Sequence, residues 1–146
     1  MPQPLKEISH VIKKDIRLFE KEFDDALCSE VKLIQTISRF LIKQKGKRIR
    51  PILTILAARI CGEPTENSYK AAAMIELLHI ATLIHDDVVD GAVKRRGWFS
   101  INRIWGNKLA VLLGDFVLSK SLIYMVKLKD FDILDAISKT AELMSS

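Results

Sequence analysis

Cysteine is scarce in this sequence. Cys28 and Cys61 are the only two among 146 residues, which is too few for a disulfide framework or a four-cysteine zinc site. We therefore expect two free thiols and a reducing, cytoplasmic environment. The sequence also lacks an N-terminal signal core and any uninterrupted apolar run of about 18 residues, which predicts a soluble protein without a transmembrane segment.

Internal repeats, low-complexity tracts and linkers rich in Pro, Gly or Ser are missing as well. With 49% hydrophobic and 28% charged residues, the chain has enough apolar side chains to bury a core, and we expect a single helical domain over residues 1–146. The alternation of apolar and polar residues that marks a strand does not compete with helical spacing. The sequence therefore predicts an all-α fold.

Apolar residues recur every three to four positions along most of the chain, which predicts about six helices. They are expected near residues 8–27, 31–41, 51–61, 69–90, 107–127 and 130–144. Pro51 suits the first position of a helix, and Gly91 suits a helix end. Asn107 and Asp130 suit N-caps. The helix over 69–90 is apolar on most sides, which indicates a central element.

Positive charge exceeds negative charge, but it is unevenly distributed. The formal net charge is +5, and the basic residues concentrate in KQKGKRIR at 43–50 and in KRR at 94–96. Such patches suit a phosphorylated ligand as well as nucleic acid, although a solvated basic loop is the simpler alternative. Because segment 43–50 precedes a predicted helix start, backbone N–H groups and basic side chains would together form an anion site.

Three aspartates stand within five residues at the end of the predicted helix over 69–90. In a helix, Asp86 and Asp90 lie one turn apart on one face, with Asp87 about 100° around the axis. Carboxylates at this spacing repel each other and face the negative end of the helix dipole, so a bound cation would relieve both effects. Mg²⁺ suits the pair because it needs only one or two carboxylates besides water and substrate phosphate.

Other interpretations of the acidic cluster fit less well. Full solvation conflicts with apolar neighbours such as Leu83 and Val88. An EF-hand calcium site lies in a glycine-containing loop, not on a helix. Zinc is a poor fit, because His79 and His85 are six residues apart on different helix faces. We interpret His85 as a supporting or core residue rather than a ligand.

Three segments together resemble the trans-type polyprenyl (isoprenyl) diphosphate synthases, especially the long-chain, octaprenyl-type members. They are GKRIRP at 46–51, LLHIATLIHDDVVDGAVKRRG at 77–97 and GNKLAVLLGDFVLSKSL at 106–122. The resemblance implies the N-terminal part of an isoprenoid-synthase-type helical bundle. It also implies an enzyme, a prenyltransferase that condenses isopentenyl diphosphate with an allylic diphosphate. The product would be a long-chain all-trans polyprenyl diphosphate, made by magnesium-assisted ionisation.

The resemblance further implies roles for individual residues. Asp86 and Asp90, the outer members of DDxxD, would bind Mg²⁺ shared with the allylic diphosphate, and Asp87 would assist. The diphosphate of isopentenyl diphosphate would be bound by Lys47, Arg50, His79 and Arg96. The diphosphate of the allylic substrate would be contacted by Arg95. Members of the family are typically homodimers without a nucleic-acid partner, and release of a long product could bring the protein close to a membrane surface.

Product length depends on the residues just before the first aspartate. Relatives that make short products commonly carry a bulky aromatic residue four or five positions before it, where this sequence has Thr82 and Ala81. Small side chains would leave a tunnel for a growing chain, which predicts products from hexaprenyl to decaprenyl. Ordinary helix packing explains the same small residues, and this alternative stays open.

Members of the family carry a second aspartate-rich motif on a later helix, and this sequence lacks one. Asp130, Asp132 and Asp135 have the wrong pattern and stand at a predicted helix start, where acids are favourable. The chain therefore resembles the N-terminal half of a synthase. Two alternatives remain: a noncatalytic fragment or subunit that binds magnesium diphosphate and needs a partner carrying the second motif, and a nucleic-acid-binding helical module.

Overall fold

The computed structural model describes residues 7, 10–44, 46–95 and 98–145, and this part of the chain is largely helical. The elements are, in chain order, α2 (Lys13–Ala26), α3 (Lys32–Lys43), α4 (Ile49–Cys61), α5 (Glu66–Val89), β1 (Lys94–Arg95), β2 (Trp98–Phe99), α6 (Ile101–Trp105), α7 (Asn107–Leu128) and α8 (Phe131–Ser145). The predicted all-α class is confirmed, with seven helices over the described ranges where about six were expected.

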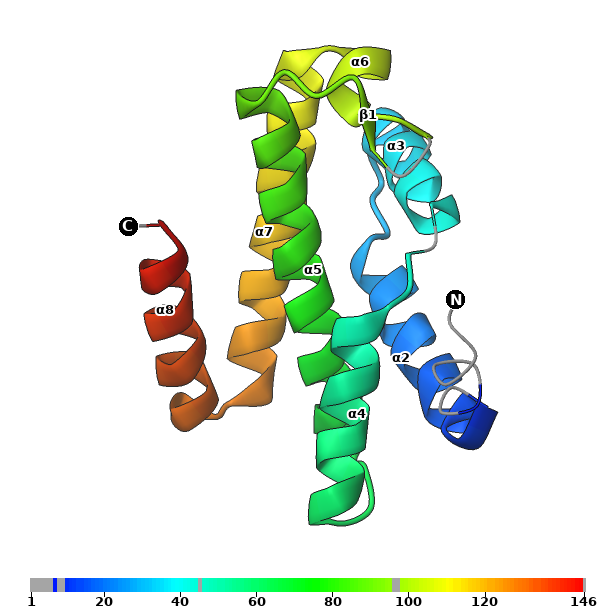
Figure 1. The fold of residues 1–146 in the computed structure, drawn as a ribbon, viewed down its shortest axis with the longest axis vertical. Helices are drawn as coiled ribbons and strands as arrows, with labels where there is room; N and C mark the ends of the chain where they lie inside the picture. Colours follow the sequence, from blue (N-terminus) through cyan, green and yellow to red (C-terminus); the bar gives the residue numbers. More distant parts are fainter. Residues whose placement is uncertain (1–6, 8–9, 45, 96–97, 146) are drawn as a thin grey trace.

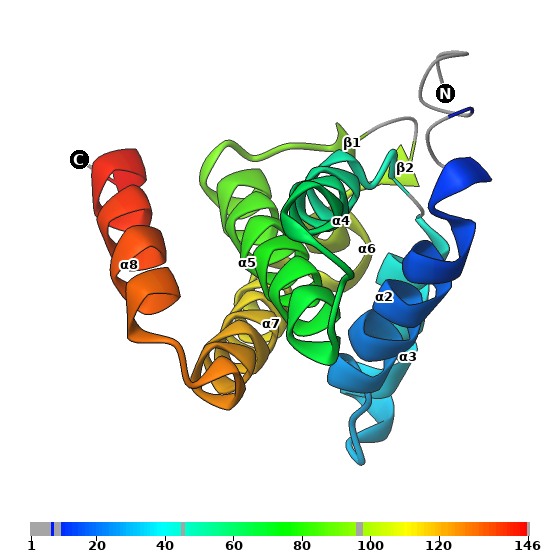
Figure 2. The same cartoon turned by 90° about the horizontal axis from the view of Figure 1, so that it is seen from below.

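Two long antiparallel helices, α5 and α7, form the centre of the molecule (Figure 1). Helices α2 and α4 pack against α5, whereas α8 lies beyond α7 (Figures 1 and 2) and contacts the core through Ile133 and Ile137. Small buried residues occur on both central helices, including Ala81 of α5 and Ala110 and Gly114 of α7. Small side chains let two helix backbones approach closely, so the central pair can pack tightly.

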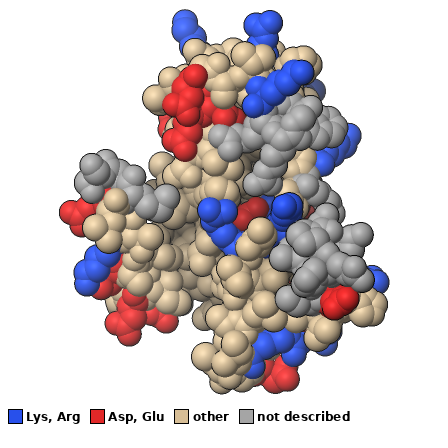
Figure 3. All heavy atoms as spheres, viewed as in Figure 1, with Lys and Arg blue, Asp and Glu red and all other residues tan. Residues whose placement is uncertain are grey.

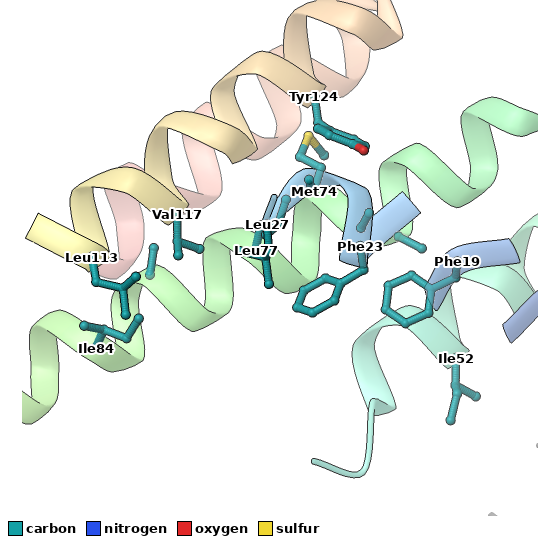
Figure 4. Close-up of a cluster of buried hydrophobic side chains, with 14 of the residues drawn as sticks. Phe19, Phe23, Leu27, Ile52, Met74, Leu77, Ile84, Leu113, Val117 and Tyr124 are labelled. Carbon is teal, nitrogen blue, oxygen red and sulfur yellow. The ribbon is translucent and has the colours of Figure 1, made fainter. Parts of the chain in front are cut away.

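The hydrophobic core lies where α2, α4, α5 and α7 meet (Figure 4). Phe19 and Phe23 of α2 pack as a tilted pair with ring centroids 5.8 Å apart. Met74 and Leu77 of α5 are fully buried in the same cluster. Each such large apolar side chain stabilises the fold by about 1.5–3 kcal/mol. The buried positions follow the helical spacing from which the helices were predicted.

Two helix starts differ from the prediction for local reasons. The helix expected from position 69 begins at 66, because the backbone N–H of Thr65 donates to Ser68 Oγ (3.1 Å) and starts the helix there. The helix expected to begin at Pro51 begins at 49, after Arg48 in the left-handed region with φ 50°. The basic segment therefore runs directly into the first turn of α4.

Three other predicted boundary residues can be checked. Gly91 has φ 61° and follows the C-terminal end of α5, as predicted for a helix stop. Asp130 caps α8, because its Oδ1 accepts the backbone N–H groups of Asp132 (3.0 Å) and Ile133 (3.1 Å). The N-cap predicted at Asn107 is wrong: it is the first helical residue, and the preceding glycine, with φ 84°, is the N-cap.

The connector between α5 and α7 contains secondary structure that helical periodicity did not predict. Strands β1 and β2 pair antiparallel, with Lys94 opposite Phe99, and α6 follows. Ser100 Oγ donates to the carbonyl of Ala92 (2.6 Å) and closes the hairpin. Two-residue strands and a five-residue helix are too short to produce a periodic signal.

Among the described helices, α7 is long and apolar enough to cross a lipid bilayer. A core helix passes the same test of length and composition, and α7 packs along α5 at the centre of the molecule. One of its faces nevertheless exposes large apolar side chains: Leu112, Leu122, Ile123 and Val126. Helical spacing places these four residues on one side of α7, away from the contact with α5.

Candidate functional site

Asp86 and Asp90 stand at the C-terminal end of α5. Asp86 belongs to the last turn and Asp90 is the C-cap, and both side chains are exposed. Neither carboxylate forms an ion pair with another residue in the described part of the chain. Acidic side chains gather near this end of α5 in Figure 3. The pair is therefore accessible to a cation.

Asp87 has different surroundings, with only 8% of the residue exposed. Its carbonyl oxygen accepts the backbone N–H of Ala92 (2.9 Å) and Nδ2 of Asn102 (3.0 Å). These bonds attach the connector and α6 to the end of α5. Asp87 thus orders the structure beside Asp86 and Asp90, while its own side chain lies off their exposed face.

The exposed acid pair fits a hard divalent cation that keeps most of its water. Over the described ranges, no group of three or more His, Cys, Asp or Glu side chains could hold a metal ion. Mg²⁺ is commonly bound through one or two carboxylates and completes its shell with water and substrate phosphates. Asp86 and Asp90 fit this mode of binding, in which a phosphorylated ligand supplies further oxygens.

A pocket of about 110 Å³ lies where α4 begins, against the middle of α5. It brings together three residues with predicted ligand roles, Lys47, Arg50 and His79. Lys47 and Arg50 are exposed and His79 is half-buried. Figure 3 shows basic side chains on both sides of a recessed acidic group over the start of α4. The arrangement suits an anion, and the three ligand roles stay predictions.

Two further charged residues line this pocket and were not selected from the sequence. Arg48 Nη1 donates to Glu76 Oε1 at 2.9 Å, and their side chains are 14% and 9% exposed. The guanidinium carbon lies 4.3 Å from the ring centroid of Phe23, within the range of a cation–π contact. The one signal in the sequence was a glutamate within an otherwise apolar stretch of the central helix.

The acid pair and the pocket lie along one stripe of α5. His79, Asp86 and Asp90 are spaced by seven and four residues, which places them on one helix face. At 1.5 Å per residue, His79 and Asp86 are about 10 Å apart along the axis. Thr82 shares this stripe, and its Oγ1 donates to the carbonyl of His79 (2.8 Å). The acidic end and the basic pocket therefore open on one face of the molecule, as Figure 3 shows.

The two residues of the predicted chain-length tunnel differ in their surroundings. Ala81 is 1% exposed and belongs to the hydrophobic core. Thr82 is half-buried and lies one turn before Asp86 on the same face. Position 82 is therefore closer to the candidate site than position 81, and a role of either residue in product length stays a prediction.

His85 packs directly on α7. A Cβ atom added at Gly114 would overlap His85 Nε2, so the imidazole occupies the space that this glycine leaves. Asp115 Oδ1 is 3.3 Å from Nε2, but Nε2 is buried without a hydrogen bond within the described structure. The distance permits an ion pair, but no hydrogen bond joins the two side chains, so we interpret the contact as packing. In the sequence, the feature that could have indicated this contact is a glycine inside an apolar helix.

The basic triplet can be followed only in part. Arg96 lies outside the described residues, and Arg95 is described only as backbone in β1. Lys94 Nζ lies 5.6 Å from the ring centroid of Phe99 across the hairpin. The predicted contacts of Arg95 and Arg96 with diphosphate groups therefore stay predictions.

Asp130, Asp132 and Asp135 do not form a second metal cluster in the described structure. Asp130 is the N-cap of α8, Asp132 lies in the first turn, and Asp135 pairs with Lys139 at 2.7 Å. Acids at the start of a helix interact favourably with the helix dipole. Their arrangement is that of an ordinary helix start.

Comparison with known proteins identifies the family. The model described as Polyprenyl synthetase matches residues 31–146. The chain is 40% identical over 127 residues to the all-trans-nonaprenyl-diphosphate synthase (geranyl-diphosphate specific) of Rhodobacter capsulatus, which covers 82% of this chain and 39% of that protein. It is 34% identical over 141 residues to the octaprenyl diphosphate synthase of Escherichia coli, which covers 97% and 44%.

A solved structure shows the same fold. The polyprenyl synthase from Caulobacter crescentus CB15, complexed with calcium and isoprenyl diphosphate, matches with a TM-score of 0.90 and 33% identity. The match covers 97% of this chain and 43% of that one, so the chain spans less than half the length of these relatives. The chain therefore belongs to the polyprenyl synthetase family, of whose fold it forms the N-terminal part.

Proposed function

We propose that the chain is the diphosphate-binding part of a prenyltransferase that makes a long-chain all-trans polyprenyl diphosphate from isopentenyl diphosphate and an allylic diphosphate. The observation that carries the proposal is the alignment of an accessible acid pair and a basic pocket on one stripe of α5. Two diphosphates bound there would be held about 10 Å apart along the helix. The names of the relatives, nonaprenyl and octaprenyl diphosphate synthases, support the same reaction.

The charged residues divide between the two substrates. Lys47 and Arg50 would bind the diphosphate of isopentenyl diphosphate, with His79 beside them on α5. Asp86 and Asp90 would hold Mg²⁺ with the allylic diphosphate, where the metal supplies positive charge that stabilises the departing group. Further contacts would come from the connector: Asp87 assists the acid pair, Arg95 contacts the allylic diphosphate and Arg96 contacts isopentenyl diphosphate.

The residues of the chain would assist ionisation of the substrate and would not attack it. The allylic C–O bond breaks, and its electron pair leaves with the diphosphate. The double bond of isopentenyl diphosphate forms the new C–C bond, and loss of a proton gives a neutral, longer allylic product. Basic side chains stabilise the negative charge that develops on the diphosphate. Apolar side chains of α5 and α7 would exclude the water that could capture the cation.

We also propose that small residues at positions 81 and 82 permit a product in the hexaprenyl-to-decaprenyl range. Replacing Thr82 or Ala81 by Tyr in the full-length enzyme should shorten the product, because an aromatic ring would block the growing chain. Thr82→Tyr should shorten the product with a smaller loss of stability than Ala81→Tyr, since Ala81 is packed in the core. Chromatography of the polyprenyl products measures both variants. An unchanged product distribution in both would contradict the tunnel.

A second candidate function is that of a noncatalytic fragment or subunit that binds magnesium diphosphate and needs a partner with the second aspartate-rich motif. The exposed apolar face of α7, formed by Leu112, Leu122, Ile123 and Val126, favours this alternative. The same face would suit the homodimer expected from the sequence. Turnover with and without the remainder of the protein separates the two functions.

The test is incubation of this chain, and of a form extended at its C-terminus, with Mg²⁺, isopentenyl diphosphate and farnesyl diphosphate. Long-chain products from the extended form alone would support a catalytic half. Binding of diphosphate without turnover by either form, with turnover only beside a partner that carries the second motif, would support the noncatalytic alternative. Absence of both product and diphosphate binding in both forms would contradict the assignment.

A further inference from the structure

Arg48 differs from its basic neighbours in the pocket. Lys47 and Arg50 are exposed, whereas the side chain of Arg48 is 14% exposed. Its guanidinium is shared between Glu76 of α5, at 2.9 Å, and the ring of Phe23 of α2, with 4.3 Å between the guanidinium carbon and the ring centroid. One side chain therefore attaches the start of α4 to two other helices.

The backbone at Arg48 is also distinctive. With φ 50° and ψ 36°, it occupies the left-handed region, which is unfavourable for a residue with a Cβ atom. No side-chain hydrogen bond caps the start of α4. The contacts of the Arg48 side chain with Glu76 and Phe23 can therefore hold this turn in place. The turn sets the relative placement of Lys47, which precedes it, and Arg50, which follows it in the first turn of α4.

We propose that Arg48 and Glu76 form a positioning pair: their ion pair holds the left-handed turn against α5 and so presents Lys47 and Arg50 to a diphosphate that neither partner contacts. The inference rests on the proposed function, because that function assigns a diphosphate to the pocket. It extends the function by separating the cation that shapes the pocket from the cations that bind the ligand.

Charge explains the need for a pair. Glu76 is 9% exposed and lies in the pocket wall, where an unpaired carboxylate would repel a diphosphate. Pairing with Arg48 neutralises it, which leaves the charges of Lys47 and Arg50 to attract the ligand. Glu76 also stands three residues before His79, so neighbouring positions of one helix surface carry both residues.

Binding of isopentenyl diphosphate to the full chain, measured calorimetrically in EDTA, distinguishes positioning from simple attraction. Glu76→Leu removes a negative charge from the pocket. If net charge alone governs binding, this variant binds more tightly, whereas positioning predicts affinity lower by about tenfold or more because the turn is released. Glu76→Gln keeps an oxygen that can accept from Arg48 and should bind at least as tightly as the unsubstituted chain.

Two arginine variants complete the design. Arg48→Gly relaxes the left-handed backbone but removes the tether, so affinity should again fall by about tenfold or more. Arg39→Leu removes the same charge from an exposed position of α3 and should leave affinity unchanged. Circular dichroism and thermal unfolding verify that each variant is folded. If Arg48→Gly does not fold, the comparison of Glu76→Leu with Glu76→Gln decides.

The outcomes separate this inference from the proposed function. Tighter binding by Glu76→Leu would overturn the positioning role alone, as would unchanged affinity in a folded Arg48→Gly variant. Lower thermal stability of both variants with unchanged affinity would show that the pair only stabilises the fold. Absence of binding by the unsubstituted chain would overturn the proposed function of the pocket, and this inference with it.

Discussion

Asp15 and Asp86 are both aspartates on helices, but their surroundings differ. Asp15 is 2% exposed and accepts hydrogen bonds from Arg59 Nε and from the hydroxyl of Tyr69, both at 2.8 Å. Asp86 is exposed and stands beside a second carboxylate. A buried acid with satisfied oxygens holds helices together, whereas an exposed acid pair leaves oxygens for a metal ion.

The contact between His85 and Gly114 gives a prediction for stability. Gly114→Ala should lower the free energy of unfolding by about 1–3 kcal/mol, because the added Cβ would overlap the imidazole. Urea denaturation measures the change. Ser119→Ala, at an exposed position of the same helix, is the control and should alter stability by no more than about 0.5 kcal/mol. Equal or greater stability of Gly114→Ala would show that the contact relaxes easily.

Candidate ligands could be predicted from the sequence, whereas the contacts of the residues around them could not. Lys47, Arg50 and the aspartates carry their chemistry in their residue types and spacing. The role of Arg48 depends on Glu76, which is 28 positions away in the sequence, and on an aromatic ring of α2. Spacing along one helix cannot reveal such contacts, because they form only when separate helices pack.

At the scale of elements, tyrosines attach α2 to both central helices. The hydroxyl of Tyr69 in α5 donates to Asp15 Oδ1 (2.8 Å), and that of Tyr124 in α7 donates to the carbonyl of Glu22 (2.8 Å). Burial raises the pKa of Tyr69 most, and the hydrogen bond to Asp15 raises it further. Burial raises the pKa of Tyr124 most, and the negative charge of Glu22 raises it further.

These pKa directions predict a loss of stability at alkaline pH. Both folded-state pKa values lie above the unfolded value of about 10. The two phenols therefore contribute fully to the free energy of unfolding below that pH, and this contribution is lost as pH rises through the folded-state values. The double variant Tyr69→Phe/Tyr124→Phe should be less stable at neutral pH, by about 1 kcal/mol per lost hydrogen bond. Its stability should also fall less steeply above about pH 10. Denaturant unfolding at a series of pH values tests this, and parallel profiles for the two proteins would contradict it.

Long helices could be predicted because their apolar residues repeat over several turns. The connector between α5 and α7 could not, because its order comes from single contacts. Ser100 bonds back to Ala92, and Trp105 of α6 packs edge-on against Phe40 of α3, with ring centroids 4.9 Å apart. Such contacts join residues that no short-range pattern relates.

At the scale of the whole molecule, the central pair of helices is covered unevenly. Helices α2 and α4 pack against α5, whereas one face of α7 exposes large apolar side chains. Exposed apolar patches of this kind commonly mark surfaces where other protein segments bind. The chain spans less than half the length of the nonaprenyl and octaprenyl diphosphate synthases to which it is similar.

Self-association through this face is the corresponding prediction. The chain should form dimers or larger species in sedimentation experiments, and Leu122→Glu should reduce its mean mass, because a charge opposes burial of the face. Thr36→Glu places the same charge at an exposed position of α3, away from this face, and is the matched control. A monomer at all concentrations, or an equal loss of association in both variants, would contradict an interface centred on Leu122.

The central claim is that one face of α5 binds two diphosphates by different chemistry, and a crossed titration tests it most directly. Asp86→Asn/Asp90→Asn should abolish Mg²⁺-dependent binding of farnesyl diphosphate and leave binding of isopentenyl diphosphate in EDTA unchanged. Lys47→Met/Arg50→Met should do the reverse. If either variant lost binding of both diphosphates, or of neither, the two-site account would be contradicted.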